Sequence, residues 1–192
     1  SGGCTLAAAE SVCADDADGA NDTLGAGAVL DVLLHLVDKS LVVAEQKEDG
    51  TRYRLLETIR QYAGEKLIQF GEAQRIRERH CAFFVAWAEG AQAQIDGPDQ
   101  VVWLRRYEAE HDNVRSALEW CRADASRADA SRADASRAAG LRLAAACAQF
   151  WELHAYGSEG AAHLIQALAD AGQDAPPTVR GWTLSRLASL LF

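Results

Sequence analysis

The residues of this chain that could do chemistry are its histidines, its cysteines and one group of carboxylates. The five histidines are dispersed along different predicted helices. His80 and Cys81 are adjacent, so on a helix their side chains point about 100° apart and cannot act on one substrate. No Ser-His-Asp or Cys-His arrangement can be built from the spacing. We therefore predict that the chain by itself is not an enzyme.

Metal and cofactor sites are not expected either. The five cysteines are odd in number, form no CxxC pair and mostly lie on apolar helical faces, which indicates buried free thiols in a reducing compartment. No histidine has ligand spacing from a cysteine pair, and no phosphate-binding loop is present. Glu108, Glu110 and Asp112 form the densest carboxylate group, and we predict a solvated helix face with Arg115 paired to Asp112.

The charge of the chain is uneven along its length. The net charge is −9, and residues 1–50 contribute −8 of it with two basic and ten acidic side chains. Residues 51–80 have a net charge of +3, from seven basic and four acidic side chains. An acidic chain is a poor general binder of nucleic acid, because neutralising phosphates supplies most of that affinity. Arg52, Arg54 and Arg60 are the candidate DNA contacts. The alternative is that they pair with acidic neighbours or with another domain of a longer protein.

Composition indicates a globular protein, with 49% apolar and 24% charged residues. No apolar run reaches the roughly 18 residues that a membrane span needs, so no membrane contact and a cytoplasmic location are expected. The chain has no methionine and ends inside an apolar helical pattern. We expect a fragment of a longer protein, and a processed mature protein is the alternative.

Residues 1–70 show the outline of a winged helix. A short helix is expected over 4–12 with Thr5 as its N-cap, and a second one over about 29–37. A β-prone segment at 41–43, an Asp-Gly turn at 48–50 and a strand at 53–55 then predict a hairpin.

Residues 71–192 are predicted to be helical throughout. Gly71 is a good residue to end the helix that begins near Leu56, and Gly97-Pro98 separates two later helices. An apolar seam with alternating spacings of four and three follows, and it contains His111: Leu104, Tyr107, His111, Val114, Leu118 and Cys121. Further helices are expected over 141–156, over 161–171 and from Pro176-Pro177 onward. Paired antiparallel helices of this length predict an α-solenoid.

Residues 122–136 repeat the pentapeptide Arg-Ala-Asp-Ala-Ser three times. A period of five advances about 500° around an α-helix, so the charges spread over all sides and no stripe can be buried. We predict a solvated, low-complexity insert that is part loop and part marginal helix.

The aromatic residues of the second half suggest one binding surface. Tryptophans fall about once per predicted helix, which is typical of packing between helices. The best candidate for a binding groove on the concave face of the solenoid is lined by Trp151, His154, Tyr156 and Trp182.

Two segments resemble a known family. The first combines 37–42 (VDKSLV), 53–63 (YRLLETIRQYA) and 65–67 (EKL), and the second runs from Trp103 to Trp120. Both are similar to the region that follows the nucleotide-binding core in bacterial STAND-type signalling ATPases, found among LuxR-type and AfsR-type transcriptional regulators. The likeness covers about 1–120 well and 138–192 loosely, and the triple repeat departs from it.

The resemblance implies a mainly α protein, with a winged-helix subdomain at 1–70 followed by tetratricopeptide-like repeats at 71–192. It implies that ATP or ADP with Mg²⁺ binds to a separate ATPase core of the parent protein, that the repeats receive a protein or small-molecule inducer, and that DNA is contacted by a separate effector domain. It also allows a histidine near the nucleotide, for which His35 is the candidate, although a partly buried structural role fits its Leu/Val-rich helix. The predicted function is a regulatory fragment that couples the ATPase core to the signal. The alternatives are a freestanding helical-repeat interaction module and a small DNA-binding winged-helix protein.

Overall fold

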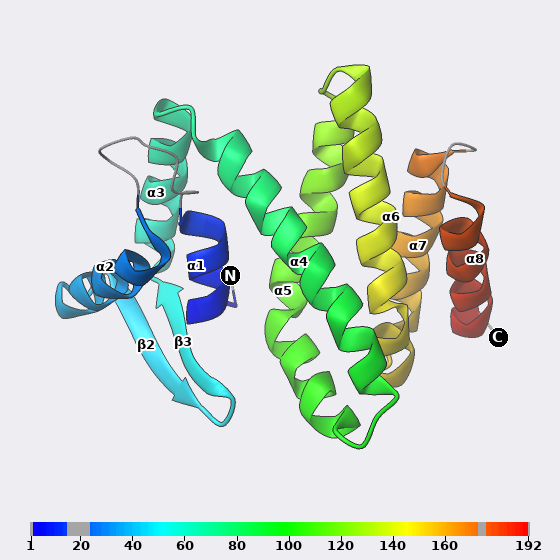
Figure 1. Ribbon diagram of the computed structural model, residues 1–192, viewed down its shortest axis with the longest axis horizontal. Coiled ribbons are helices and arrows are strands. Elements are labelled where there is room, and N and C mark those ends of the chain that lie inside the picture. The colour runs from blue at the N-terminus through cyan, green and yellow to red at the C-terminus, as the bar shows by residue number, and fades with distance from the viewer. Residues whose placement is uncertain (1, 15–23, 173–175, 192) are drawn as a thin grey trace. The chain divides into compact units, whose positions relative to one another are not determined.

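The chain folds into helices joined to one small sheet, as a computed structural model that describes residues 2–14, 24–172 and 176–191 shows (Figure 1). Within those residues the secondary structure is eight helices and a three-stranded antiparallel sheet. This confirms the prediction of a mainly α chain with a small β-hairpin. Two compact units are present, residues 1–83 and residues 84–192.

The sheet of the first unit has the strand order β1-β3-β2. Strands β2 (Val42–Lys47) and β3 (Gly50–Leu55) form the predicted hairpin, with Lys47 opposite Gly50. Gly50 has φ +118°, a value that L-residues rarely adopt, which is why glycine suits this turn. Strand β1 (Cys4–Thr5) pairs with β3. Cys4 therefore lies in a strand, whereas the local pattern predicts that it belongs to the helix over 4–12. A pairing 49 residues away decides its conformation.

Two helices pack with this sheet. Helix α1 (Leu6–Cys13) has the predicted cap, because the Thr5 hydroxyl accepts a hydrogen bond of 3.2 Å from the Ala8 N–H. Helix α2 (Ala26–Asp38) follows and leads into β2. The buried apolar side chains of these elements form a small core, which consists of Ala8, Ala9, Val12, Val29, Val42 and Tyr53.

Helix α3 (Glu57–Gln69) ends as local chemistry predicts. Gly71 has φ +73°, and the N–H groups of Gly71 and Glu72 donate to the carbonyls of Ile68 and Leu67 at 3.1 and 2.9 Å. These two bonds are the Schellman motif, and they confirm Gly71 as the residue that ends the helix. Helix α3 has no buried residue among those the structure describes.

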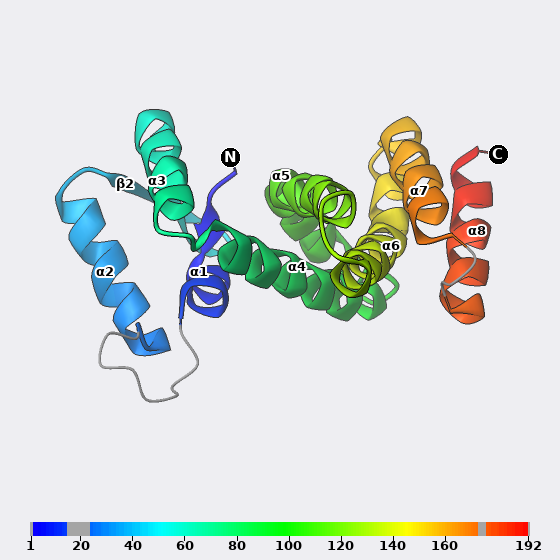
Figure 2. The same ribbon diagram turned by 90° about the horizontal axis from the view of Figure 1, so that it is seen from above.

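Long helices build the second unit. Helix α4 (Ala73–Ile95) begins in the first unit and ends in the second. It is followed by α5 (Gln100–Ala125), α6 (Ala130–Leu153), α7 (Gly157–Ala171) and α8 (Pro177–Leu191). Seen from above, α6 lies between α5 and α7 (Figure 2). The predicted seam of α5 is confirmed for Tyr107, His111, Val114, Leu118 and Cys121, which are all buried, whereas Leu104 at its start is half-buried.

Helix α6 is the centre of this unit. It packs against α5, α7 and α8, and its buried side chains include Leu141, Leu143, Cys147, Phe150 and Trp151. Many of the others are alanines, which let neighbouring helices approach closely without large side chains between them.

The repeat at 122–136 forms the hairpin between α5 and α6. Its first copy ends α5, its second contains the turn, and its third lies in the first turns of α6. The prediction of a solvated insert is wrong for Asp124, Ala133 and Ser136, which are buried. A period of five spreads the charges around any single helix, whereas two antiparallel helices bring positions from different copies face to face. Helix α6 accordingly begins eleven residues earlier than the expected start at 141.

No helix among the described residues is long and apolar enough to cross a membrane.

Candidate functional site

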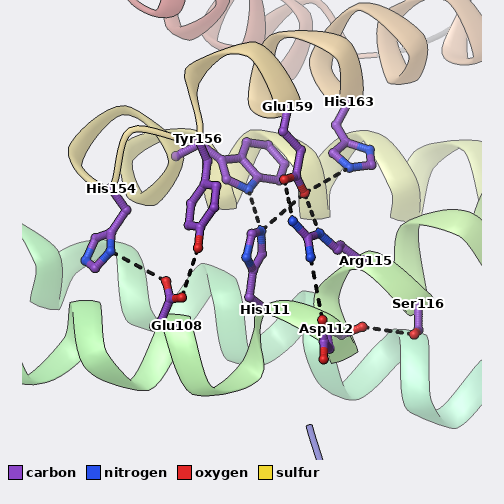
Figure 3. Close-up of polar contacts among 10 residues, drawn as sticks. Glu108, His111, Asp112, Arg115, Ser116, His154, Tyr156, Glu159 and His163 are labelled. Carbon is purple, nitrogen blue, oxygen red and sulfur yellow. Dashed lines mark hydrogen bonds and ion pairs between the residues drawn. The ribbon is translucent and has the colours of Figure 1, made fainter. Parts of the chain in front are cut away.

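A network of polar and aromatic side chains joins α5 to the corner between α6 and α7 (Figure 3). Helix α5 supplies Glu108, His111, Asp112 and Arg115 from one face, since residues three, four and seven apart lie together on a helix. His111 lies in the apolar seam and is buried, whereas Glu108 and Asp112 at its edge are exposed.

The corner between α6 and α7 supplies the other side of the network. Helix α6 ends at Leu153, and Ala155 then takes a left-handed conformation with φ +59°. This tight turn lets His154 and Tyr156 face α5 together, and α7 then contributes Glu159 and His163. Glu159 and His163 are four residues apart and so share one face of α7.

The Glu159 carboxylate is the hub of the network. The Arg115 guanidinium donates to it with both arms, Nε to Oε1 at 2.6 Å and Nη2 to Oε2 at 2.5 Å. This bidentate pair is the strongest geometry available to an ion pair. Arg115 also lies 3.6 Å from Asp112 within α5, which confirms the predicted pairing of those two residues. The network therefore links α5 and α7 through two residues that are 44 positions apart in sequence.

His111 lies between a donor and an acceptor. The Trp151 indole Nε1–H donates to His111 Nε2 across 3.4 Å, and Glu159 Oε1 lies 3.3 Å from the same nitrogen. The two contacts need opposite states of Nε2, because this nitrogen accepts from the indole only when it carries no proton and donates to the carboxylate only when it carries one. Burial and the Arg115 charge lower the pKa of His111 and outweigh the opposing effects of Glu159, Glu108 and Asp112. The neutral imidazole is therefore favoured, and its tautomer decides which of the two contacts is a hydrogen bond.

A second set of contacts surrounds Glu108. The Tyr156 hydroxyl donates to Glu108 Oε1 at 2.9 Å, and His154 Nδ1 lies 3.5 Å from Oε2. The hydrogen bond to Glu108 raises the pKa of Tyr156. The ring of Tyr156 also lies 4.5 Å from the His111 ring between centroids, which joins both sets of contacts.

Close packing holds the corner in place. Trp151 is fully buried, and its ring stacks on His163 with centroids 5.5 Å apart and planes 19° apart. Gly160 lies directly against this indole, since a Cβ there would meet Trp151 atoms at 2.7–2.9 Å. Only glycine lets α7 approach α6 so closely.

The electrostatics of the network favour a charged carboxylate beside neutral imidazoles. The hydrogen bonds from Arg115 lower the pKa of Glu159 and raise the pKa of Arg115. Burial lowers the pKa of His163. The described residues include no group of three or more side chains arranged to hold a metal ion. The ion pair and the close packing at Gly160 can fix the angle between two helical hairpins.

The three predicted DNA-contacting arginines are engaged within the first unit. Arg54 pairs with Glu45 at 2.7 Å, and Arg60 pairs with Glu57 at 2.5 Å. The Arg52 guanidinium donates to the carbonyls of Gly2 and Gly3 at 3.1 and 3.0 Å. Pairing with acidic neighbours, the alternative weighed from the sequence, therefore describes Arg54 and Arg60. His35 is exposed on α2, so its expected partial burial is wrong.

The four residues of the predicted groove lie in different places. Trp151 is buried in the core, and His154 and Tyr156 gather around Glu108. Trp182 is 36% exposed and lines a separate groove of about 310 Å³ between α4, α6 and α8, together with Glu89, Arg142 and Val179. The four side chains predicted to line one groove therefore do not share a surface.

Sequence reasoning missed Glu159 and Gly160 and misjudged Glu110. Glu110 is 6% exposed and accepts a hydrogen bond of 2.6 Å from Asn113, so the expected solvated face is wrong at this position. The seam offered one signal, because Glu110 and Asn113 each flank a buried seam residue. Nothing local to α7 indicates that Glu159 faces Arg115.

The chain is similar to longer mycobacterial proteins. It is 44% identical over 121 residues to proteins of Mycobacterium tuberculosis and Mycobacterium bovis that are provisionally named HTH-type transcriptional regulators. The match covers 63% of this chain and 13% of each relative, so the chain spans a small part of their length. An uncharacterized protein of Mycobacterium tuberculosis is 42% identical over 80 residues, 41% of this chain and 19% of that protein. No protein-family model matches the chain, and no solved structure matches it significantly.

Proposed function

We propose that this chain is a regulatory segment of a larger transcriptional regulator. The observation that carries the proposal is the 44% identity over 121 residues to proteins named as transcriptional regulators. The order of elements in the first unit supports it, because two helices followed by a β-hairpin are the outline of a winged helix. The segment works in the cytoplasm, where transcription takes place.

The finer form of the proposal follows the likeness to STAND-type ATPases. A nucleotide-binding core elsewhere in the parent protein binds ATP or ADP with Mg²⁺, and the first unit contacts that core. The second unit receives a partner or inducer on its helices, which form a tetratricopeptide-like array. Exposed apolar side chains of α3 and its C-cap residue support the contact between the first unit and the core, since Tyr62, Ile68 and Phe70 are each at least 59% exposed.

The network around Glu159 gives the second unit a means of passing on a signal. A bidentate ion pair joins α5 to α7, and a buried histidine–indole contact joins α5 to α6, so together they hold these helices at one angle. A partner that favours another angle has to break these contacts, so its binding free energy is coupled to the position of the helices. The groove beside Trp182 is the predicted contact surface for a protein partner.

A transcript profile tests the proposal. The segment is deleted in frame from the parent gene in its host, and an immunoblot checks that the shortened protein accumulates. We expect a defined set of transcripts to change, whereas a strain with synonymous recoding of the segment matches the wild type. Identical transcript profiles in the deletion and wild-type strains would contradict a regulatory role.

Direct DNA binding is the second candidate function, and it rests on the basic stretch from Arg52 to Arg79. The engagement of Arg52, Arg54 and Arg60 inside the first unit favours the regulatory segment instead. Filter binding of duplex DNA at low and high salt separates the two. We expect no salt-dependent retention, whereas retention that falls steeply with salt would support the DNA-binding alternative.

A freestanding interaction module is the remaining alternative. It predicts that the polypeptide accumulates in the host as an independent product of about 21 kDa. An immunoblot of the host with an antibody against this segment distinguishes it from the parent protein.

A further inference from the structure

A cavity of about 270 Å³ lies between α5, α6 and α7. Helices α5 and α7 pack on α6 much more than on each other, and the cavity lies where they diverge. It is separate from the groove beside Trp182, which α4, α6 and α8 form. Several lining residues belong to the pentapeptide repeat, including Arg122, Ala125 and Ser136.

The floor of the cavity is apolar and made of small side chains. Cys121, Gly140 and Ala167 are buried there, next to Leu118. Gly140 lets α6 approach α5 closely at this floor, since a Cβ at this position would lie 3.3 Å from the Cys121 Cβ. A floor of this kind accepts an aliphatic group and offers few hydrogen bonds.

The rim of the cavity carries separate positive and negative groups. Arg122 and Glu119 both line it from α5, and neither forms an ion pair with another residue that the structure describes. Glu119 acts on His163 only through its charge. The other charged lining residues are already engaged. Arg137 donates to Asp134 at 2.7 Å, and Asp170 accepts from Gln166 at 2.8 Å.

We infer that this cavity binds a small zwitterion of the class of α-amino acids with an aliphatic side chain. The ligand carboxylate pairs with Arg122, its ammonium group pairs with Glu119, and its side chain lies on the apolar floor. A ligand with a single charge leaves one rim group without a partner. The volume lies just below the roughly 300–1,000 Å³ of pockets for drug-sized ligands, which fits a metabolite of this size.

The cavity adjoins the network that holds α5 and α7 together. His163 lines the cavity, stacks on Trp151 and lies 3.7 Å from Glu159. A ligand that contacts His163 therefore acts on the carboxylate that Arg115 holds. This inference rests on the proposed function, in which the zwitterion is the inducer.

Calorimetric titration of the 192-residue chain tests the inference with three probes. L-leucine carries both charges, 4-methylpentanoate retains only the carboxylate, and 3-methylbutylamine retains only the ammonium group. We expect L-leucine to bind at millimolar or lower concentration and each single-charge analogue to bind about tenfold or more weakly. Absence of heat with L-leucine, or equal affinity for 4-methylpentanoate, would overturn the inference.

Variants locate the binding site. Ala162 is exposed on α7 and lines the cavity, so Ala162→Leu fills the space and abolishes L-leucine binding. Ala169 is exposed on the same helix and does not line the cavity, so Ala169→Leu is the matched control and binds as the wild type does. Arg122→Ala changes an exposed side chain and weakens binding about tenfold, which keeps the test decisive if circular dichroism shows that Ala162→Leu is unfolded. Unchanged affinity in Arg122→Ala would also overturn the inference.

The two proposals fail separately. If deletion of the segment alters transcripts but L-leucine does not bind, the cavity is not the inducer site and the regulatory role stands. If L-leucine binds and the deletion alters no transcript, the binding site stands and the regulatory role fails.

Discussion

The three aspartates of the pentapeptide repeat have the same neighbours in sequence and different neighbours in space. Asp124 is buried and accepts a hydrogen bond of 2.6 Å from Ser136, with Arg132 3.5 Å away. Asp129 caps α6 by accepting from the Arg132 N–H at 3.1 Å. Asp134 is exposed and pairs with Arg137. The environment of each aspartate therefore decides what it contributes.

Alanine substitutions at these three positions should lower the free energy of unfolding by different amounts. Asp124→Ala leaves a buried hydroxyl without its acceptor and should lower the free energy of unfolding by about 1–3 kcal/mol. Asp129→Ala should cost about 1 kcal/mol through loss of the cap. Asp134→Ala, the matched control, should change it by less than about 0.5 kcal/mol. Urea denaturation measures all three, and equal costs would contradict the assigned roles.

Gly160 is a second residue whose importance comes from its neighbour. Gly160→Ala places a Cβ within 2.9 Å of Trp151, so α7 must shift, and we expect a loss of about 1–3 kcal/mol. Gly90→Ala is the control, because it lies within α4 and has no atom within 4 Å of its added Cβ. It should stabilise the chain by up to about 1 kcal/mol. Similar effects of the two substitutions on urea denaturation would contradict the close approach.

At the scale of elements, contacts between the helical hairpins fix the position of α5 relative to α7. Helix α6 lies between them and supplies the core, while Arg115 and Glu159 supply the only bidentate ion pair that joins α5 to α7 among the described residues. The pair is partly exposed, so solvent screens it, and its value lies in the geometry that it selects.

A double-mutant cycle measures this contact. Arg115→Ala and Glu159→Gln should show a coupling energy of about 1 kcal/mol that falls as salt is raised. The control is the pair Arg137 and Asp134, which joins residues of one helix and should couple by less than about 0.5 kcal/mol. A coupling between Arg115 and Glu159 no larger than that of the control pair would show that the pair does not hold the hairpins.

At the scale of the whole molecule, one histidine of the first unit and two of the second have lowered pKa values, so their protonation opposes folding. Burial lowers the pKa of His80 in the first unit from 6.5 to about 4. Burial also lowers the pKa values of His111 and His163 in the second unit. Lowering the pH should therefore decrease the free energy of unfolding of each unit.

The sign of the pH dependence follows from proton binding. Between pH 6.5 and about 4 the unfolded chain binds more protons at His80 than the folded chain does, so stability falls as pH falls. His80 alone should cost about 2 kcal/mol at pH 5 relative to neutral pH. Urea denaturation from pH 8 to pH 5 measures the slope, and His80→Gln should make it shallower. A slope that His80→Gln leaves unchanged would contradict the burial argument.

Local chemistry made much of the fold predictable. The Thr5 cap, the hairpin turn at Gly50 and the helix end at Gly71 each depend on neighbours within a few residues, and all were expected. The seam of α5 was also predictable, because a helix puts residues at spacings of three and four on one side. Strand β1 and the burial of Glu110 were not, because both depend on partners that the local pattern does not specify.

The sequence by itself determined the helices, the hairpin and the apolar face that α5 buries, because hydrophobic period and capping act over a few residues. Only the tertiary structure decided that Glu159 meets Arg115, that His111 lies between Trp151 and Glu159, and that identical pentapeptides have different environments. These contacts join residues 40 or more positions apart or opposite sides of a hairpin. Such distances are set by how whole helices pack, and no short stretch of sequence records them.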